Sequence, residues 1–327
     1  FMYRTAKQIH NLIQEANHII LVPHKDPDGD ALGSLTAFKQ YLTRINKPHT
    51  AYCATEIPEN FKDLRHVQDI NSDETVWQNN NFDLVIVFDS GDLRHAGIDG
   101  YVAGLSKKIS VINIDHHFTN EQYGHLNMVS PNGSSTAEVV YNFFKYNDIK
   151  IDEVMATSLL AGLITDTDFY TNSATSLSSL QITSKLISYG GNLKLIKEIV
   201  FKNKTIDVLK LWGAVLSRLK KHETLDVIYT YMTQSDLEKY NIPESVSDGI
   251  SNFMNNLNDG GICLLFKELP DNKIKGSFRT TNDNFDVSLI AKELGGGGHK
   301  KAAGFTIDGP LKKAAQRVFT TIQTYKK

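Results

Sequence analysis

The sequence predicts an α/β protein with two domains, a larger N-terminal one with a mainly parallel sheet flanked by helices and a smaller C-terminal one with a mixed sheet. Three short apolar runs, at residues 18–22, 82–88 and 109–114, indicate buried strands, and segments with helical spacing accompany them. The period-two alternation that begins near residue 224 indicates a second, β-rich domain. With 327 residues, the chain is long enough for two cores.

Composition restricts the functions that the chain can have. The hydrophobic content of 41% and the charged content of 22% are typical of a globular protein, and the formal net charge of -2 gives no basic excess for binding long nucleic acids. Cys53 and Cys263 are too few for a disulfide framework, so we expect a reducing, cytoplasmic setting. The longest apolar run, at 154–164, is shorter than the roughly 20 residues that span a membrane, and no membrane partner is expected.

The turn after the first strand is the first segment that carries chemistry. A helix is expected over residues 5–17, the strand over 18–22 and a second helix from Ala31. The turn before Ala31 holds one histidine and three aspartates, namely His24, Asp26, Asp28 and Asp30. A capping role would explain only one of these acids. The segment therefore predicts ligands for one or two divalent cations, with the part of Asp26 left open.

The clearest buried strand, at residues 82–88, ends on a further acid, Asp89. Arg94 and His95 follow in a loop that could reach a phosphate. A solvated loop without any such role explains these two residues equally well, so both interpretations stay open.

The triplet Asp115-His116-His117 ends the apolar run 109–114. Taken alone, it could do no more than cap a turn. Chemistry in open parallel sheets lies at the carboxyl ends of the strands, so three strands that end in such groups predict one shared site.

Two helices are expected beside this site. Ser134 or Ser135 is the expected cap of a helix that starts there; these hydroxyls could also touch a ligand, but capping is the simpler role. The apolar run 154–164 predicts a buried helix that delivers Asp166. A carboxylate at a helix C-terminus meets the unfavourable end of the helix dipole, and a metal ion would compensate for it.

The C-terminal part offers different groups. A helical connector is expected between residues 182 and 221, and strands are expected at 227–232, 261–267 and 273–279. Arg279 ends the last of these strands, and a helix over 286–294 leads into the run Gly295-Gly296-Gly297-Gly298-His299. Consecutive glycines let backbone N–H groups surround an anion, although a flexible surface turn would have the same composition. A helix over residues 310–327 completes the chain.

The N-terminal domain thus offers four carboxylates and two imidazoles without a thiolate: His24, Asp28, Asp30, Asp89, His116 and Asp166. This set favours a hard-to-borderline ion with five or six ligands, Mn²⁺ ahead of Zn²⁺. Asp89, which ends the most central-looking strand, is the expected bridge between two ions. Such an ion pair supports in-line displacement at phosphorus, so the sequence predicts hydrolysis of a phosphate ester.

The motifs His24-x3-Asp28-x-Asp30, Asp89, Asp115-His116-His117 and Asp166 resemble the metal motifs of the DHH phosphoesterase superfamily. The glycine-rich run through Gly304 resembles the signature of the associated C-terminal domain. The similarity spans nearly the whole chain, and the length resembles that of the nanoRNase members. It implies a metal-binding catalytic domain over residues 1–188, a helical linker over 189–222 and a substrate-binding domain over 223–327, with the active site in the cleft between the domains.

The resemblance also implies ligand roles. One manganese ion would be bound by His24, Asp28 and Asp89, and the other by Asp30, Asp89, His116 and Asp166, with Mg²⁺ or Co²⁺ as possible substitutes. His117 would act at the scissile phosphate beside Asp89, and Asp115 would orient a histidine. The distal phosphate of the substrate would be bound by Arg279, His299 and the backbone of Gly296, Gly297 and Gly298, with Arg94 as a further contact.

The nanoRNase members degrade very short oligoribonucleotides and remove the 3′-phosphate of 3′-phosphoadenosine 5′-phosphate. The resemblance therefore implies these substrates and no long duplex. Two alternatives stay open, a soluble phosphodiesterase for cyclic or linear dinucleotides and a non-catalytic nucleotide sensor. The chain is expected to be a monomer or a homodimer.

Overall fold

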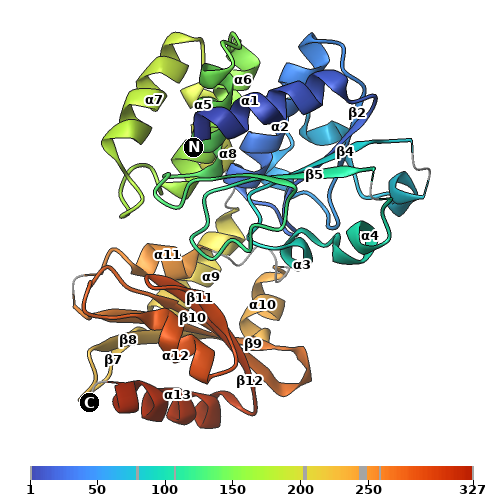
Figure 1. The fold of residues 1–327 in the computed structure, drawn as a ribbon. Helices are drawn as coiled ribbons and strands as arrows, with labels where there is room; N and C mark the ends of the chain where they lie inside the picture. Colours follow the sequence, from blue (N-terminus) through green and yellow to red (C-terminus); the bar gives the residue numbers. More distant parts are fainter. Residues whose placement is uncertain are drawn as a thin grey trace. The chain divides into compact units, whose positions relative to one another are not determined.

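The computed structural model describes residues 2–78, 81–106, 108–201, 205–242, 249–257 and 259–325. The chain forms two compact units, Phe1–Asn203 and Lys204–Lys327, each with its own six-stranded sheet (Figure 1). Two helices of the segment expected to be a linker lie on either side of this division, α8 (Leu193–Phe201) and α9 (Ile206–Leu216). The domain boundaries at residues 188 and 222 stay predictions.

The sheet of the first unit is parallel throughout, as the sequence predicts. Its strand order is β3-β2-β1-β4-β5-β6, and every neighbouring pair is parallel. The strands are β1 (Ile19–Val22), β2 (His49–Tyr52), β3 (Ile70–Asn71), β4 (Leu84–Phe88), β5 (Ser110–Asp115) and β6 (Leu126–Val129). All residues of β1 and β4 are buried, because helices cover both faces of the sheet.

The side chains of one strand divide between the two faces. Ile19 and Leu21 of β1 pack into one core, and Ile20 and Val22 pack into the other. The first core is covered by α1 (Met2–Glu15), α2 (Gly29–Arg44), α5 (Thr136–Tyr146), α6 (Glu153–Asp166), α7 (Leu177–Ser188) and α8. The second is covered by η3 (Glu74–Trp77), α3 (Leu93–Ala96) and α4 (Asp99–Ala103). The 3₁₀ helices η1 (Glu59–Phe61) and η2 (Val67–Asp69) also pack on the first core.

The strand order reverses between β1 and β4. From β1 the chain proceeds to β2 and β3 on one side, whereas β4, β5 and β6 extend on the other. Ligands of open α/β sheets bind outside the carboxyl ends of the strands at such a switch point. In this unit the residues that follow β1 and β4 include His24 and Asp89.

The sheet of the second unit is mixed, as predicted, with the order β11-β12-β10-β9-β8-β7 and one parallel pair, β8 with β9. Its strands are β7 (Lys220–Lys221), β8 (Val227–Met232), β9 (Ile262–Leu269), β10 (Lys273–Arg279), β11 (Gly297–His299) and β12 (Ala302–Asp308). One face packs with α12 (Val287–Glu293) and α13 (Leu311–Tyr325), and the other with α9, α10 (Gln234–Tyr240) and α11 (Ile250–Met254). The short η5 (Pro270–Asn272) joins β9 to β10.

The alternative of a flexible turn for the glycine run is wrong, because Gly297–His299 forms β11 and pairs antiparallel with β12. A Cβ on Gly296 would lie 2.0 Å from the carbonyl oxygen of Gly304, so the close approach of these two segments requires glycine there. Both cysteines are free and buried, as expected. Among the described helices, none has the length and apolar content to cross a bilayer.

Candidate metal centre

Asp89 occupies the centre of the cluster at the carboxyl ends of β1, β4 and β5. It has a positive φ of 57°, which is uncommon for a residue other than glycine. Its backbone N–H donates to the Ile114 carbonyl at 3.0 Å, and its side chain is buried. Strained residues of this kind persist only where the surrounding structure fixes them, and they concentrate at functional sites.

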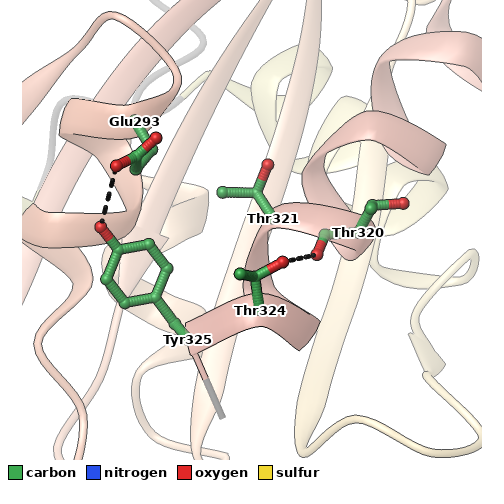
Figure 2. Close-up of a pocket in the computed structure, with 5 residues that line it drawn as sticks. All are labelled: Glu293, Thr320, Thr321, Thr324 and Tyr325. Atoms are coloured by element: carbon green, nitrogen blue, oxygen red, sulfur yellow. Dashed lines mark hydrogen bonds between the residues drawn. The ribbon is translucent and has the colours of Figure 1, made fainter. Parts of the chain in front are cut away.

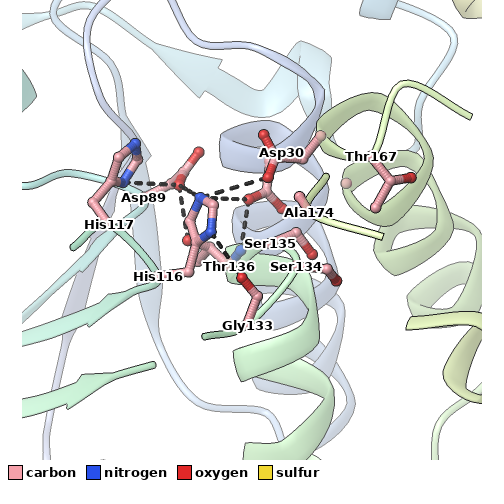
Figure 3. Close-up of polar contacts among 12 residues, drawn as sticks. Asp30, Asp89, His116, His117, Gly133, Ser134, Ser135, Thr136, Thr167 and Ala174 are labelled. Atoms are coloured by element: carbon pink, nitrogen blue, oxygen red, sulfur yellow. Dashed lines mark hydrogen bonds and ion pairs between the residues drawn. The ribbon is translucent and has the colours of Figure 1, made fainter. Parts of the chain in front are cut away.

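The two oxygens of Asp89 face different histidines. Its Oδ2 lies 3.7 Å from His24 Nε2, and its Oδ1 lies 3.7 Å from His116 Nε2. Figure 3 shows Asp89 beside His116 and His117. One carboxylate that faces two groups with its two oxygens has the geometry of a bridging ligand.

His24 and Asp28 stand on one side of Asp89. The Nδ1 of His24 lies 2.7 Å from the Lys25 carbonyl, which leaves Nε2 directed at Asp89 and at Asp28 Oδ1, 3.7 Å away. A backbone carbonyl commonly orients a metal-binding histidine in this way. Asp28 is also the N-cap of α2, since its Oδ1 accepts from the N–H groups of Asp30 and Ala31. The cap and ligand interpretations of Asp28 are therefore compatible.

Asp30, His116 and Asp166 form the other side. His116 Nε2 lies 3.9 Å from Asp30 Oδ2 and 3.6 Å from Asp166 Oδ2, while its Nδ1 lies 3.3 Å from the Gly133 carbonyl. Asp166 is the last residue of α6 and not a residue after its end, because the helix continues two residues beyond the apolar run 154–164. The three residues share one potential metal-binding group.

Close packing of α2 on α6 brings Asp30 and Asp166 together. A Cβ on Gly33 would lie 2.4 Å from the Ser158 carbonyl oxygen, and one on Gly162 would lie 2.6 Å from Asp30 Oδ1. Side chains at these two positions would force the helices apart. The two glycines therefore help to set the spacing between the acids of these helices.

The N-terminus of α5 supports the cluster in a way that the sequence only hinted at. Ser135 is the N-cap, as one of the expected alternatives has it. The N–H groups of Thr136 and Ala137 donate to the two oxygens of Asp30 at 2.6 and 2.9 Å, and the Thr136 hydroxyl donates to Asp89 Oδ1 at 2.8 Å. Thr136 thus contacts two of the acids. No local sequence pattern predicted these two contacts.

His117 and Asp115 form a separate pair beside Asp89. The Asp115 carboxylate is completely buried and accepts from His117 Nδ1 at 2.7 Å, and the same His117 nitrogen lies 3.7 Å from Asp89 Oδ1. Asp115 also accepts from the Asn120 side chain. The asparagine is a second supporting residue that the sequence interpretation missed.

The electrostatics of the carboxylates point to a missing positive charge. Burial, reinforced by the Asp89 and Asp166 carboxylates, raises the pKa of Asp30 well above its ordinary value. Burial also raises the pKa of Asp166 to about 7, and it raises the pKa of Asp89. Crowded, buried acids of this kind are typical of functional sites.

The pKa values of two histidines, His24 and His117, are raised, although burial alone would lower them. Burial by itself would lower the pKa of His24, but the hydrogen bond with Asp28 and the charge of Asp89 outweigh it and raise the pKa to about 9. The pKa of His117 is likewise raised to about 9, because the hydrogen bond with Asp115 outweighs burial. The acids around these two rings thus favour positive charge at the cluster.

The donor set fits divalent metal ions. Two atoms that each lie about 2.1 Å from one ion are roughly 3 to 4.2 Å apart, and the histidine-to-carboxylate distances of 3.6 to 3.9 Å fall within this range. The cluster contains two potential metal-binding groups that share no residue. One consists of His24, Asp28 and Asp89, and the other of Asp30, His116 and Asp166. A third joins Asp89, His116 and His117. Asp89 is therefore placed to contact both ions.

Two other predicted residues of this unit lie outside these groups. Asp26 has an exposed side chain, and its backbone N–H donates to Thr55 Oγ1. The Arg94 side chain is 73% exposed and lies near Asp92 and Glu121. Its neighbour His95 does reach the site, where its ring stacks on the His24 ring with centroids 4.7 Å apart. Arg94 and His95 are both exposed and lie in the short helix α3 instead of a loop, so the choice between a solvated position and a substrate role stays open for both.

The predicted substrate-binding residues of the second unit lie at the end of the inner strand β10 and at the edge strand β11. Arg279 ends β10, where its Nε donates to Asn252 Oδ1 and its Nη1 to the Phe278 carbonyl. Gly296, Gly297 and Gly298 lead into and form β11, and the side chain of His299 lies outside the described part. These roles stay predictions.

A pocket of about 390 Å³ in the second unit lies elsewhere, between α12 and α13 (Figure 2). It is lined by Glu293, Thr320, Thr321, Thr324 and Tyr325. The Tyr325 hydroxyl donates to the Glu293 carboxylate at 3.4 Å. None of the predicted site residues lines this pocket.

Comparison with known proteins identifies both parts of the chain. Residues 18–163 match the family model described as the DHH family, N-terminal domain, and residues 224–325 match the DHHA1 domain. The bifunctional oligoribonuclease and PAP phosphatase NrnA of Thermus thermophilus is 28% identical over 93% of this chain and 89% of its own length. The protein of the same name from Bacillus subtilis is 26% identical over 88% of this chain and 89% of its own.

A solved structure shares the fold. An exopolyphosphatase-related protein from Bacteroides fragilis superimposes with a TM-score of 0.92 at 24% identity, covering 99% of this chain and 96% of that one. At this identity the likeness establishes the fold alone. Together with the two family models, it assigns the same architecture to the whole chain.

Proposed function

Since this chain belongs to the DHH family of phosphoesterases and has a DHHA1 domain in its C-terminal part, we propose that it hydrolyses phosphate esters of small nucleotides with the help of two manganese ions. Its substrates are very short oligoribonucleotides, which it degrades as an exonuclease, and 3′-phosphoadenosine 5′-phosphate, from which it removes the 3′-phosphate. The names of the relatives from T. thermophilus and B. subtilis support this assignment.

The observation that carries the proposal is the position of Asp89 between His24 and His116. Asp89 would contribute to both ions, His24 and Asp28 would hold the first, and Asp30, His116 and Asp166 would hold the second. Such a metal pair activates water and stabilises negative charge on the phosphoryl oxygens. Carboxylate and imidazole donors without thiolate favour Mn²⁺, with Mg²⁺ or Co²⁺ as substitutes.

His117 is the residue that acts on the substrate itself. Asp115 accepts a hydrogen bond from His117 Nδ1 at 2.7 Å, and this bond orients the ring beside Asp89. The buried Asp115 carboxylate also favours the protonated ring, so His117 can donate a proton to the leaving oxygen. Asp115 orients His117 and does not touch the substrate.

Small substrates suit the charge of the chain. Long nucleic acids gain affinity by releasing counterions to many lysines and arginines, and a net charge of -2 supplies no such excess. We propose that Arg279, His299, Arg94 and the backbone of Gly296, Gly297 and Gly298 bind a second phosphate of the substrate.

The test is product analysis with Mn²⁺ on labelled oligoribonucleotides of graded length, from dinucleotides upward, alongside 3′-phosphoadenosine 5′-phosphate and cyclic dinucleotides. We expect rapid cleavage of the shortest linear substrates, release of phosphate from the bisphosphate and loss of both activities in the Asp89→Asn variant. Asp207→Asn, which removes an exposed carboxylate from α9, is the matched control.

Inactivity of the wild-type protein on dinucleotides and on the bisphosphate would refute the proposal. Preference for cyclic dinucleotides would replace it with the phosphodiesterase alternative. Tight binding of nucleotides without turnover would instead favour a sensor.

A further inference from the structure

Phe118, the residue directly after the triplet, is unusually exposed. Its side chain is 85% exposed, the highest value among the large apolar side chains that the structure describes. Single exposed apolar residues are ordinary on protein surfaces, so exposure alone has little meaning. What distinguishes Phe118 is its place beside His117 and the way its backbone is held.

Phe118 occupies the first central position of a tight turn. The N–H of Asn120 donates to the His117 carbonyl at 3.2 Å, which closes the turn with Phe118 and Thr119 at its centre. The ring is thus attached to the cluster by a single peptide unit, and the turn limits the positions it can take relative to His117.

The side chain of Asn120 anchors this turn to two neighbouring strand ends. Its Nδ2 donates to the Ser90 carbonyl at 3.2 Å and to Asp115 Oδ2 at 2.5 Å, and its Oδ1 accepts from Asn113 Nδ2 at 2.8 Å. A fixed backbone reduces the conformational entropy that Phe118 loses when it binds something. The exposed ring is therefore presented on a rigid support.

The chain segment that follows Phe118 is polar. Thr119, Asn120, Glu121 and Gln122 follow it in the chain, and Arg94 Nη2 lies 3.5 Å from Glu121 Oε1. A protein partner would need a contiguous apolar patch. A nucleobase has flat apolar faces and polar edges, so one aromatic ring among polar groups suits it better.

We propose that Phe118 is the stacking platform for the nucleobase of the nucleotide whose phosphate lies at the metal centre. The inference rests on the proposed function and deepens it, because it makes the base, and not only the phosphates, a determinant of substrate choice. Stacking tolerates every base, so Phe118 favours nucleotides over bare phosphate esters without selecting one sequence.

The experiment compares wild-type protein with Phe118→Ala and Phe118→Trp on two substrates, 3′-phosphoadenosine 5′-phosphate and its abasic analogue, with Mn²⁺ present. For Phe118→Ala we expect KM for the adenosine substrate to rise roughly 5- to 150-fold, the range of one base–aromatic stack, with kcat little changed. KM for the abasic analogue stays the same, and Phe118→Trp retains the wild-type KM. Leu209→Ala, at an exposed leucine of α9, is the control for loss of a surface side chain.

The outcomes separate this inference from the proposed function. Wild-type protein that hydrolyses neither substrate refutes the proposed function. Active wild-type protein whose KM is the same in Phe118→Ala refutes only the stacking role. An equal loss on the adenosine and abasic substrates, with an unchanged melting temperature, also overturns it, because the ring would then act without the base.

Discussion

Both units bury carboxylates, but they balance the charge differently. In the second unit, the Arg218 guanidinium donates two hydrogen bonds to Asp236, at 2.5 and 2.7 Å, and this pairing lowers the pKa of Asp236 to about 2. In the first unit, the neighbours of Asp30 and Asp166 include further carboxylates, and burial and this repulsion raise their pKa values.

The difference separates a structural acid from a functional one. A buried acid that has its own arginine is satisfied by the fold, and its loss should affect stability. The acids of the first unit have hydrogen-bond donors and histidines beside them but, among the described residues, no paired guanidinium of this kind, and such a cluster favours an external cation. The comparison predicts that substitutions in the two regions change different properties.

The largest effect is expected for Asp89→Asn. Asparagine tolerates the positive φ of 57° and keeps the side-chain shape, so the variant tests charge and not backbone strain. We expect kcat/KM on a diribonucleotide to fall about 10³-fold or more, since one carboxylate serves both ions. Near-wild-type activity with a normal melting temperature would contradict the bridging role.

The second largest effect is expected for the stabilisation of the protein by Mn²⁺. Mn²⁺ at a hundred times its dissociation constant should stabilise the first unit by about 2.7 kcal/mol, because a ligand that binds only the folded state stabilises it by mass action. A titration of melting temperature against Mn²⁺, with a chelator as reference, measures this. The shift should shrink in Asp89→Asn and persist in Asp236→Asn; its absence in the wild-type protein would show that the cluster is not a metal centre.

Asp236→Asn should lower stability without changing activity. The carboxylate pKa is depressed to about 2 from 3.8, so its contribution is present above pH 4 and is lost as the pH falls from about 4 towards 2. At neutral pH we expect a loss of about 2 kcal/mol, measured by urea unfolding of both proteins. A variant as stable as the wild type, or one that loses activity while folded, would contradict the assignment of Asp236 as a structural acid that differs from the acids of the first unit.

The smallest effect is expected for Thr136→Val, which removes the hydroxyl that donates to Asp89 but keeps the shape of the side chain and the backbone bond to Asp30. Residues that support a ligand change metal affinity about 10- to 100-fold, and a value near 10-fold is expected here because Asp89 keeps its other contacts. Calorimetric Mn²⁺ titration measures it, and Thr136→Ser should restore the affinity. An unchanged affinity in Thr136→Val would make the contact incidental.

The strands that precede the candidate site residues could be predicted from local pattern, whereas several short or edge strands could not. Short apolar runs identify β1, β4 and β5, and the residues that follow them include His24, Asp89 and the triplet. A segment cannot be assigned from its local pattern alone where that pattern fits both a loop and a strand. The glycine run has the composition of a loop, but its pairing with β12, a contact that local composition does not reveal, makes it a strand. The alternatives for Arg94 stay open for the same reason.

The sequence by itself therefore determined the fold class, the positions of the strand ends and the types of donor groups, because these depend on apolar spacing and on residues next to one another in the chain. Only the tertiary structure decided how those groups face one another: that the two oxygens of Asp89 point at different histidines, that Thr136 reaches two of the acids, and that Phe118 stands exposed on an anchored turn. The contacts of Asp89 and Thr136 join segments that are dozens of residues apart in the chain, and the turn of Phe118 is anchored by a contact of the same kind. The geometry of all of them follows from the packing of helices and strands on a common sheet.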